Sequence, residues 1–408
     1  MIILRTIVLA VLLVVSLAAP RLAAQSLPQG PLRSPDGSLV VGGEIVGTVG
    51  APDNDAFFNY TDYEHNALRM LRLALAGSWQ PLAPIALVAE IRSEDLRHIE
   101  AHAAYVRVRP WATHAFDIQA GRIPPSFGAY GRRAYNADNP LIGYPLAYQY
   151  LTSLRSDAIP GSTDDLLRMR ARGWQPSFPI GSNAVSTGIP LVSAFRWDTG
   201  VQGRWAGHHV EVTGAVTAGT LSDPRFVDNN GGRQLSGRVA VKPLFGMVLG
   251  ASAARGSWLS NDVVARLPES YRTEDYVQRA FGVDAEYSRD YWVVRGEVVW
   301  SGWDMPFVAS NESDKLDAVG MWVEGRYRVT PRLFLAARAD RLGFSHISGT
   351  LFSGQPTTWD APVERLEVGA GWYLQRNLVA RAVLQRNWRD GGRVRSRTFL
   401  SAQLAYWF

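Results

Sequence analysis

The sequence predicts an all-β protein, a transmembrane antiparallel β-barrel of about 16 strands with a long third outer loop. Alternating stretches of about 10 to 13 residues recur along the chain, and a tilted strand needs this length to cross a bilayer. Tight turns alternate with long connections between these stretches. After residue 24, no run of 18 apolar residues could form a spanning helix. Because lipid cannot form hydrogen bonds with the backbone groups at the edge of an open sheet, the sheet must close on itself.

Period-2 alternation and the turn residues define the individual strands. The predicted spans are 38–50, 66–80, 83–93, 98–110, 114–122, 192–206, 208–220, 233–243, 246–257, 276–288, 291–302, 316–328, 332–343, 362–374, 377–388 and 396–408. In the fourth span, Glu100 and His102 share one face while Arg107 and Arg109 take the other, which predicts a bulge near Tyr105. Short turns on one side of the membrane and long loops on the other are typical of transmembrane barrels.

The span 291–302 shows which face meets lipid. Its apolar face runs from Trp292 to Trp300, and the opposite face carries Arg295 and Glu297. An arginine at the bilayer midplane costs about 2–4 kcal/mol, so the charged face must line a wet lumen. The two tryptophans then fall at the two membrane interfaces. The same alternation assigns these further residues to the lumen: Arg196, Asp198, Arg326, Arg365 and Glu367.

The first residues predict export. Arg5 precedes an apolar run that ends at Leu17, and small residues follow up to Ala24. This layout is typical of a secretory signal peptide over 1–24, the alternative being an uncleaved anchor. The remainder divides into an N-terminal periplasmic segment, 25–37, and the barrel, 38–408. The chain has no cysteine, which excludes thiolate metal sites and disulfides.

The end of the chain, Leu404-Ala-Tyr406-Trp-Phe408, closes an alternating stretch. One face of that stretch carries Thr398, Leu400, Ala402, Leu404, Tyr406 and Phe408. It resembles the C-terminal strand of bacterial outer-membrane β-barrels, whose terminal Phe is read by the barrel-assembly machinery. The resemblance implies that Tyr406 and Phe408 form an assembly signal. It also implies a location in the outer membrane, in contact with its lipids and lipopolysaccharide.

The connection 123–190 is far longer than the others and is the third outer loop. Structureless loops of this length are usually functional. In strand count and in the enlarged third loop, the chain resembles general bacterial porins, although their Pro-Glu-Phe-Gly-Gly loop signature is absent. The resemblance implies passive diffusion of small hydrophilic solutes past a constriction. General porins are trimers latched by their second loop, which here is only Ser93 to Arg97, so both a homotrimer and a monomer stay open.

Basic residues of the long loop are candidates for the constriction. They are Arg132, Arg133, Arg168, Arg170 and Arg172. Ser162 followed by two acids predicts the capped start of a short helix that carries the last three. One interpretation is a basic constriction that favours anions. The alternative is that these arginines pair with lumen carboxylates or with lipopolysaccharide at the rim.

Charge and motifs limit the other function classes. The lumen face carries slightly more bases than acids, which predicts a weak preference for anions. No basic cluster with interleaved aromatics is present, which argues against nucleic-acid binding. His98, Glu100 and His102 share one face, but a role at the lumen rim is favoured over metal binding. No catalytic or cofactor motif occurs. The alternatives to a porin are an adhesion barrel closed by its third loop and, less favoured, a lipid-acting enzyme.

Overall fold

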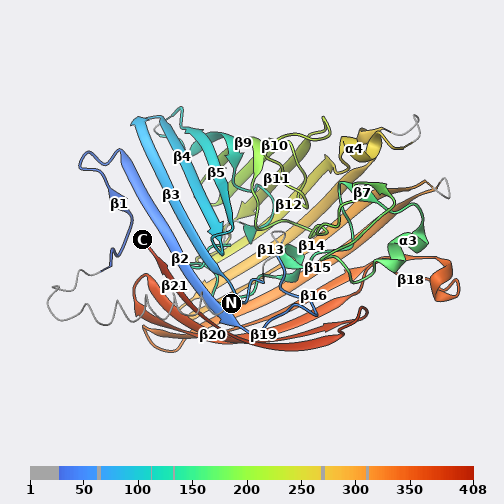
Figure 1. Cartoon of the computed structure of the whole chain (residues 1–408). Helices are drawn as coiled ribbons and strands as arrows, with labels where there is room; N and C mark the ends of the chain where they lie inside the picture. Colours follow the sequence, from blue (N-terminus) through green and yellow to red (C-terminus); the bar gives the residue numbers. More distant parts are fainter. Residues whose placement is uncertain (1–26, 62–65, 112, 132–133, 268–271, 309–311) are drawn as a thin grey trace.

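The chain folds as a closed antiparallel β-barrel with the C-terminus and the short strand β1 at one end and its long loops at the other (Figure 1). The computed structural model describes residues 27–61, 66–111, 113–131, 134–267, 272–308 and 312–408. The main sheet has 17 strands, of which the short β1 (Leu32–Arg33) only flanks β2, while the other 16 close through the pairing of β2 with β21. Among the described residues, no helix is long and apolar enough to span a membrane.

The barrel strands follow one another around the wall in chain order. They are β2 (Leu39–Gly50), β3 (Leu71–Leu82), β4 (Ile85–Glu94), β5 (His98–Val108), β6 (Phe116–Ile123), β9 (Asp198–Ala206), β10 (Val210–Thr217), β11 (Gln234–Val241), β12 (Met247–Ser257), β13 (Val277–Arg289), β14 (Trp292–Phe307), β15 (Glu312–Arg328), β16 (Leu333–Phe344), β19 (Val363–Gln375), β20 (Leu378–Arg389) and β21 (Ser396–Trp407).

The predicted barrel of about 16 strands is confirmed, and each predicted span overlaps one strand. Three details differ. β14 and β15 extend further toward the loop end than predicted, because they pair up to Phe307 and Glu312. β9 begins at Asp198, because 191–195 is buried as the last part of the long connection. The bulge in β5 lies at His102 rather than near Tyr105, since Glu90 pairs with Ala103 and Ile91 with Ala101.

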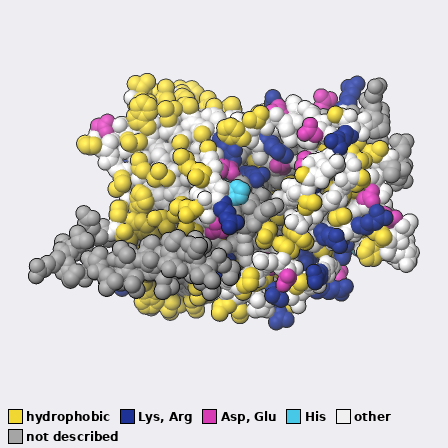
Figure 2. Space-filling model, in the orientation of Figure 1, with side chains coloured by type: hydrophobic (Ala, Val, Ile, Leu, Met, Phe, Trp, Pro, Cys, Tyr) yellow, Lys and Arg dark blue, Asp and Glu magenta, His cyan; other side chains and the backbone are white. Residues whose placement is uncertain are grey.

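Side chains alternate between a lipid face and an inner face. In β13, Phe281 and Val283 are exposed while Asp284 is buried. Trp292, at the start of β14, and Trp300, near its middle, are both exposed on the lipid face. In Figure 2 hydrophobic side chains cover the barrel wall on the left, whereas charged side chains gather over the loops on the right.

The long connection between β6 and β9 packs inside the barrel. It contains the short elements α2 (Leu146–Gln149), β7 (Ala158–Ile159), α3 (Thr163–Arg168) and β8 (Ile180–Gly181). Every residue from Leu141 to Ser156 is buried, and α2 contacts β15 and β16. The remaining short elements lie in the other outer loops: α4 (Asn261–Val264), η2 (Thr273–Asp275), β17 (His346–Ile347), η3 (Thr350–Phe352) and β18 (Thr357–Thr358).

The two ends of the described chain meet on the turn side of the barrel. The backbone of Phe408 exchanges two hydrogen bonds with Gly43, with N···O distances of 3.1 and 3.0 Å. A Cβ at Gly43 would lie 2.8 Å from the Phe408 ring, so only glycine allows this approach. The hydroxyl of Tyr406 donates to the carbonyl of Pro28 at 2.8 Å. The predicted signal peptide, 1–24, lies outside the described residues.

Substitution of Val283 by Arg tests the assignment of the lipid face. Val283 lies at the middle of β13 and is exposed on the apolar side. We expect Val283→Arg to lower the free energy of unfolding by about 2–4 kcal/mol in lipid vesicles, measured by urea unfolding, because the charge enters hydrocarbon. Leu244→Arg, in an exposed periplasmic turn, is the control and should cost about 0–1 kcal/mol. Equal effects of the two substitutions would contradict the assignment.

Candidate functional site in the barrel lumen

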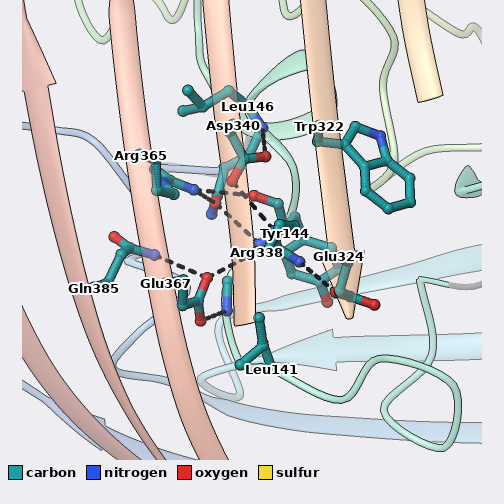
Figure 3. A network of polar contacts seen from close by, with 12 residues as sticks. Leu141, Tyr144, Leu146, Trp322, Glu324, Arg338, Asp340, Arg365, Glu367 and Gln385 are labelled. Atoms are coloured by element: carbon teal, nitrogen blue, oxygen red, sulfur yellow. Dashed lines mark hydrogen bonds and ion pairs between the residues drawn. The ribbon is translucent and has the colours of Figure 1, made fainter. Parts of the chain in front are cut away.

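A buried charge cluster lies on the inner wall where β15, β16 and β19 meet (Figure 3). Arg338 is its centre, because its strand neighbours Glu324 and Glu367 stand directly opposite on the two sides. The guanidinium contacts Glu324 at 3.2 Å, Glu367 at 2.8 Å and Asp340 at 3.3 Å. Such a cluster is stable only when its remaining lone pairs and protons find partners.

The same carboxylates bind the backbone of the long loop. Glu367 Oε1 accepts from the N–H groups of Ile142 and Gly143, at 3.2 and 2.8 Å. Asp340 accepts from the N–H of Leu146 at 3.2 Å. A Cβ on Gly143 would lie 2.5 Å from Glu367, so the close approach requires glycine. The wall therefore supplies the acceptors for these three loop N–H groups.

Two further wall carboxylates bind the loop at other points. Glu297 accepts from the N–H of Ala129 at 2.9 Å and from the hydroxyl of Tyr148 at 2.7 Å. Glu44, on β2, accepts from the backbone and the side-chain amide of Asn136, at 3.0 and 2.9 Å. Because β2 and β14 lie apart in the strand order of the barrel, the loop is tied to well-separated parts of the wall.

Whereas wall acids accept hydrogen bonds from the loop, wall arginines donate hydrogen bonds to loop carbonyls. Arg295 donates to the carbonyl of Asp138 at 2.8 Å, and Arg365 donates to that of Tyr144 at 3.0 Å. Arg381 donates to the carbonyl of Asn136. Wall acids thus hold loop N–H groups and wall bases hold loop carbonyls, so the charges act as a clamp on the loop.

An aromatic cluster fills the space between the loop and the wall. The Tyr130 ring lies 5.1 Å from Tyr148 and 5.7 Å from Trp322 of β15, measured between ring centroids. Tyr144 packs edge-on against Phe195 at 5.2 Å. These rings are buried, and aromatic pairs with this geometry contribute beyond the apolar area that they bury. The loop therefore has a packed core of its own.

The first outer loop joins the same core. The carbonyl of Phe58 accepts from Arg365 at 2.7 Å, and the Asn59 amide donates to Gln385 at 2.8 Å. Asp53 accepts from the N–H of Asn59 at 2.8 Å. Burial raises the pKa of the Asp53 carboxyl to about 6, because desolvation outweighs its hydrogen bonds. This acid therefore destabilises the folded loop increasingly as the pH rises from the ordinary pKa of 3.8 to about 6, above which the effect is complete.

A second buried acid links the long loop to the outer loop before β19. Asp360 accepts from the N–H groups of Ser153 and Ala171, at 2.7 and 2.8 Å. Burial raises the pKa of the Asp360 carboxyl above its usual range, while these hydrogen bonds act in the opposite direction. The outer end of the loop is thus fixed to the barrel rim as well as to the wall.

The arginines predicted for the constriction lie elsewhere. Arg168 and Arg172 are exposed, and Arg168 pairs with Asp165 on its own helix at 2.8 Å. Arg170 donates to the carbonyl of Thr358 at 3.0 Å. Helix α3 packs against η3 in another outer loop, which places these three residues at the outer rim (Figure 1). Arg132 and Arg133 lie outside the described residues.

The residues assigned to the lumen by alternation lie on the inner side. Asp198 is buried and accepts from the N–H of Arg225 at 3.0 Å, so it fixes the following outer loop. Arg196 lines a narrow gap beside Asp198. Arg326 lines a hollow of about 330 Å³ on the periplasmic side of the loop, together with Glu286 and Arg295. The contacts of Glu297, Arg365 and Glu367 are those described above.

The histidine–carboxylate set of β5 has structural contacts. The His102 ring packs against Trp197 at 4.8 Å, and Arg122 pairs with Glu100. Within the described residues, no group of three or more His, Asp or Glu side chains could hold a metal ion. The sequence did not predict the hydrogen bonds that loop N–H groups donate to wall carboxylates. It indicated inward-facing acids, but it does not reveal which backbone groups these acids bind.

No known family model matches the sequence, and no curated protein is similar to it. Several solved structures share its fold. An anion-selective porin from Comamonas acidovorans superposes with a TM-score of 0.56 at 9% identity, covering 91% of this chain and 99% of that one. OmpF of Salmonella typhi, solved in complex with daunomycin, superposes with a TM-score of 0.54 at 12% identity, covering 91% of this chain and 97% of that one.

A loop-deletion mutant of OmpT, an outer membrane protein of Vibrio cholerae, gives a TM-score of 0.54 at 11% identity and covers 91% and 99% of the two chains. This chain has the fold of a porin-like outer-membrane β-barrel. At such low identity the likeness extends to the fold of the barrel alone. The loop clamp of the barrel is therefore argued from its own residues.

Removal of the central arginine tests the clamp. Arg338→Met leaves Glu324, Asp340 and Glu367 without their shared cation, so we expect the free energy of unfolding to fall by roughly 3–5 kcal/mol. Arg341→Met is the control, because Arg341 pairs with Glu364 in an exposed position and should cost about 0–1 kcal/mol. Urea unfolding in vesicles measures both. Equal stability of Arg338→Met and the parent would contradict a clamp centred on this residue.

Proposed function

We propose that the barrel is an outer-membrane porin through which small hydrophilic solutes diffuse, and that the third loop, 124–197, narrows the path. The observation that carries this proposal is the charged inner wall of a closed 16-strand barrel, which holds the loop by its backbone. A barrel of this size encloses an aqueous channel unless something fills it. In this proposal the third loop, and not the barrel wall, sets the width of the channel.

Two hollows on the periplasmic side support a solute path, and the first of them reaches the loop. One of about 330 Å³ is lined by Asp138, Glu286 and Arg326. The other, of about 760 Å³, includes Asp117 and Arg204 in its lining. Their mixed charge suits hydrated solutes of either sign. We propose a weak preference for anions, because lumen bases slightly outnumber lumen acids, and one protein of the same fold is an anion-selective porin.

The extent of loop burial favours a second candidate. Because every residue from Leu141 to Ser156 is buried, the loop could close the lumen, and the barrel would then serve adhesion or surface interaction. A lipid-acting enzyme is a third hypothesis, tested by release of fatty acid from phospholipid micelles. The proposed porin carries out no catalysis and needs no cofactor.

Location and assembly follow from the same proposal. The chain is exported through a signal peptide, 1–24, and inserted by the barrel-assembly machinery, which reads Tyr406 and Phe408. The backbone of Phe408 pairs with Gly43 of β2 where the barrel closes. Phe408 therefore takes this position only when the last strand has paired with the first. Sedimentation in detergent separates a monomer from a homotrimer.

Single-channel recording tests the proposed function. Residues 25–408 are refolded into a planar bilayer beside a variant that lacks 140–181 and carries a short Gly-Ser linker. We expect steady conductance of the parent and a larger conductance of the variant, because the deletion removes 141–156, which is buried inside the barrel. The reversal potential in a salt gradient should show weak anion preference.

The control for this recording is a deletion of 353–355, an exposed part of another outer loop, which should leave conductance unchanged. A silent parent with a conducting 140–181 deletion would favour the closed barrel. Silence of both would contradict a channel function. A cation-preferring reversal potential would overturn the proposed ion preference alone.

A further inference from the structure

An apolar trough crosses the outer surface of β9 to β13. Gly203, Gly214, Gly237 and Ala253 are successive cross-strand neighbours at one level of the wall. The level next to them toward the outer loops carries the larger Val201, Val216 and Leu235. The result is a hollow of about 680 Å³ on the lipid face.

The shape and lining of the trough fit a hydrocarbon chain. No heavy atom lies within 4 Å of a Cβ built on Gly214, so the depth arises from missing side chains. Phe281 is the next neighbour of Ala253 and is exposed, which bounds one end of the trough. An apolar, open depression on a membrane face favours lipid, since an acyl chain fills it without losing polar hydration.

Two arginines lie at the outer edge of the trough. Arg255 and Arg279 are cross-strand partners on the lipid face of β12 and β13, and both line the hollow. Asp304 binds Arg279 with both carboxylate oxygens, at 3.0 and 2.8 Å. Within the described parts of the chain, Arg255 has no ion-pair partner. Like charges directly opposite each other destabilise a sheet. A second anion, beside Asp304, would offset the repulsion between Arg255 and Arg279.

We propose that the trough and this arginine pair bind lipopolysaccharide of the outer leaflet. A phosphate of its lipid A moiety lies on Arg255, and an acyl chain lies along Gly214 and Gly237. This inference rests on the outer-membrane location proposed above, and it is independent of conductance. A second copy of the barrel is a poorer occupant, because an apolar contact between barrels would leave the charge of Arg255 without a partner.

Native mass spectrometry of the detergent-solubilised barrel, titrated with purified lipid A, tests the site. We expect the parent to retain the lipid, and Arg255→Gln to weaken binding about tenfold, as for one lost charge-assisted hydrogen bond. Gly214→Leu has free space for its Cβ, places a larger side chain in the trough and should weaken binding to a similar degree. Arg341→Gln, on the lipid face of β16 and paired with Glu364, is the matched control and should bind as the parent does.

Three results would overturn the proposal. The first is equal lipid A affinity of the parent, Arg255→Gln and Gly214→Leu, with folding of each verified by its heat-modifiable mobility. The second is equally tight binding of phosphatidylglycerol, which would remove the assignment to the glycolipid. The third is a lipid-free oligomer that Gly214→Leu splits into monomers, which would assign the trough to a second copy. Arg255→Gln should conduct as the parent does, so this proposal and the porin function fail separately.

Discussion

The contact of Arg338 with three inner-wall carboxylates is the interaction on which the lumen depends. A closed sheet leaves no edge on which an inserted loop could extend a strand ladder, so loop backbone groups that find no partner within the loop need partners among wall side chains. Glu367 and Asp340 serve as acceptors for loop N–H groups while Arg338 contacts both. This shared cation offsets part of the negative charge of the acids that bind the loop.

This arrangement explains how a loop with little regular structure is ordered at the centre of the barrel. Its few helical and strand residues satisfy only a small part of its backbone. Other loop groups bond within the loop, as Thr152 does to Ile189, and further ones bond to Glu297 and Arg295 of β14, Glu44 of β2 and Arg365 of β19. Lumen charges that would tune ion passage in an open channel here serve largely to position the loop, which makes the loop the decisive element for transport.

The sequence predicted the barrel and most strand positions, because alternation is imposed by lipid on one face and water or loop on the other. It did not predict the extension of β14, since Trp303 to Phe307 lacks alternation. It assigned a constriction to Arg168, Arg170 and Arg172, whereas the fold of the loop carries them to the rim. Which part of a long loop reaches the lumen depends on tertiary contacts that no local pattern contains.

The most direct measurement of the clamp is amide hydrogen exchange of the refolded barrel in lipid. We predict that the N–H groups of Ile142, Gly143 and Leu146 exchange at least about 10³-fold more slowly than that of Gly231, which bonds to Asp228 in an exposed outer loop. Slow exchange would show that the wall holds the loop as the barrel strands hold one another. Exchange of Gly143 as fast as that of Gly231 would contradict the clamp.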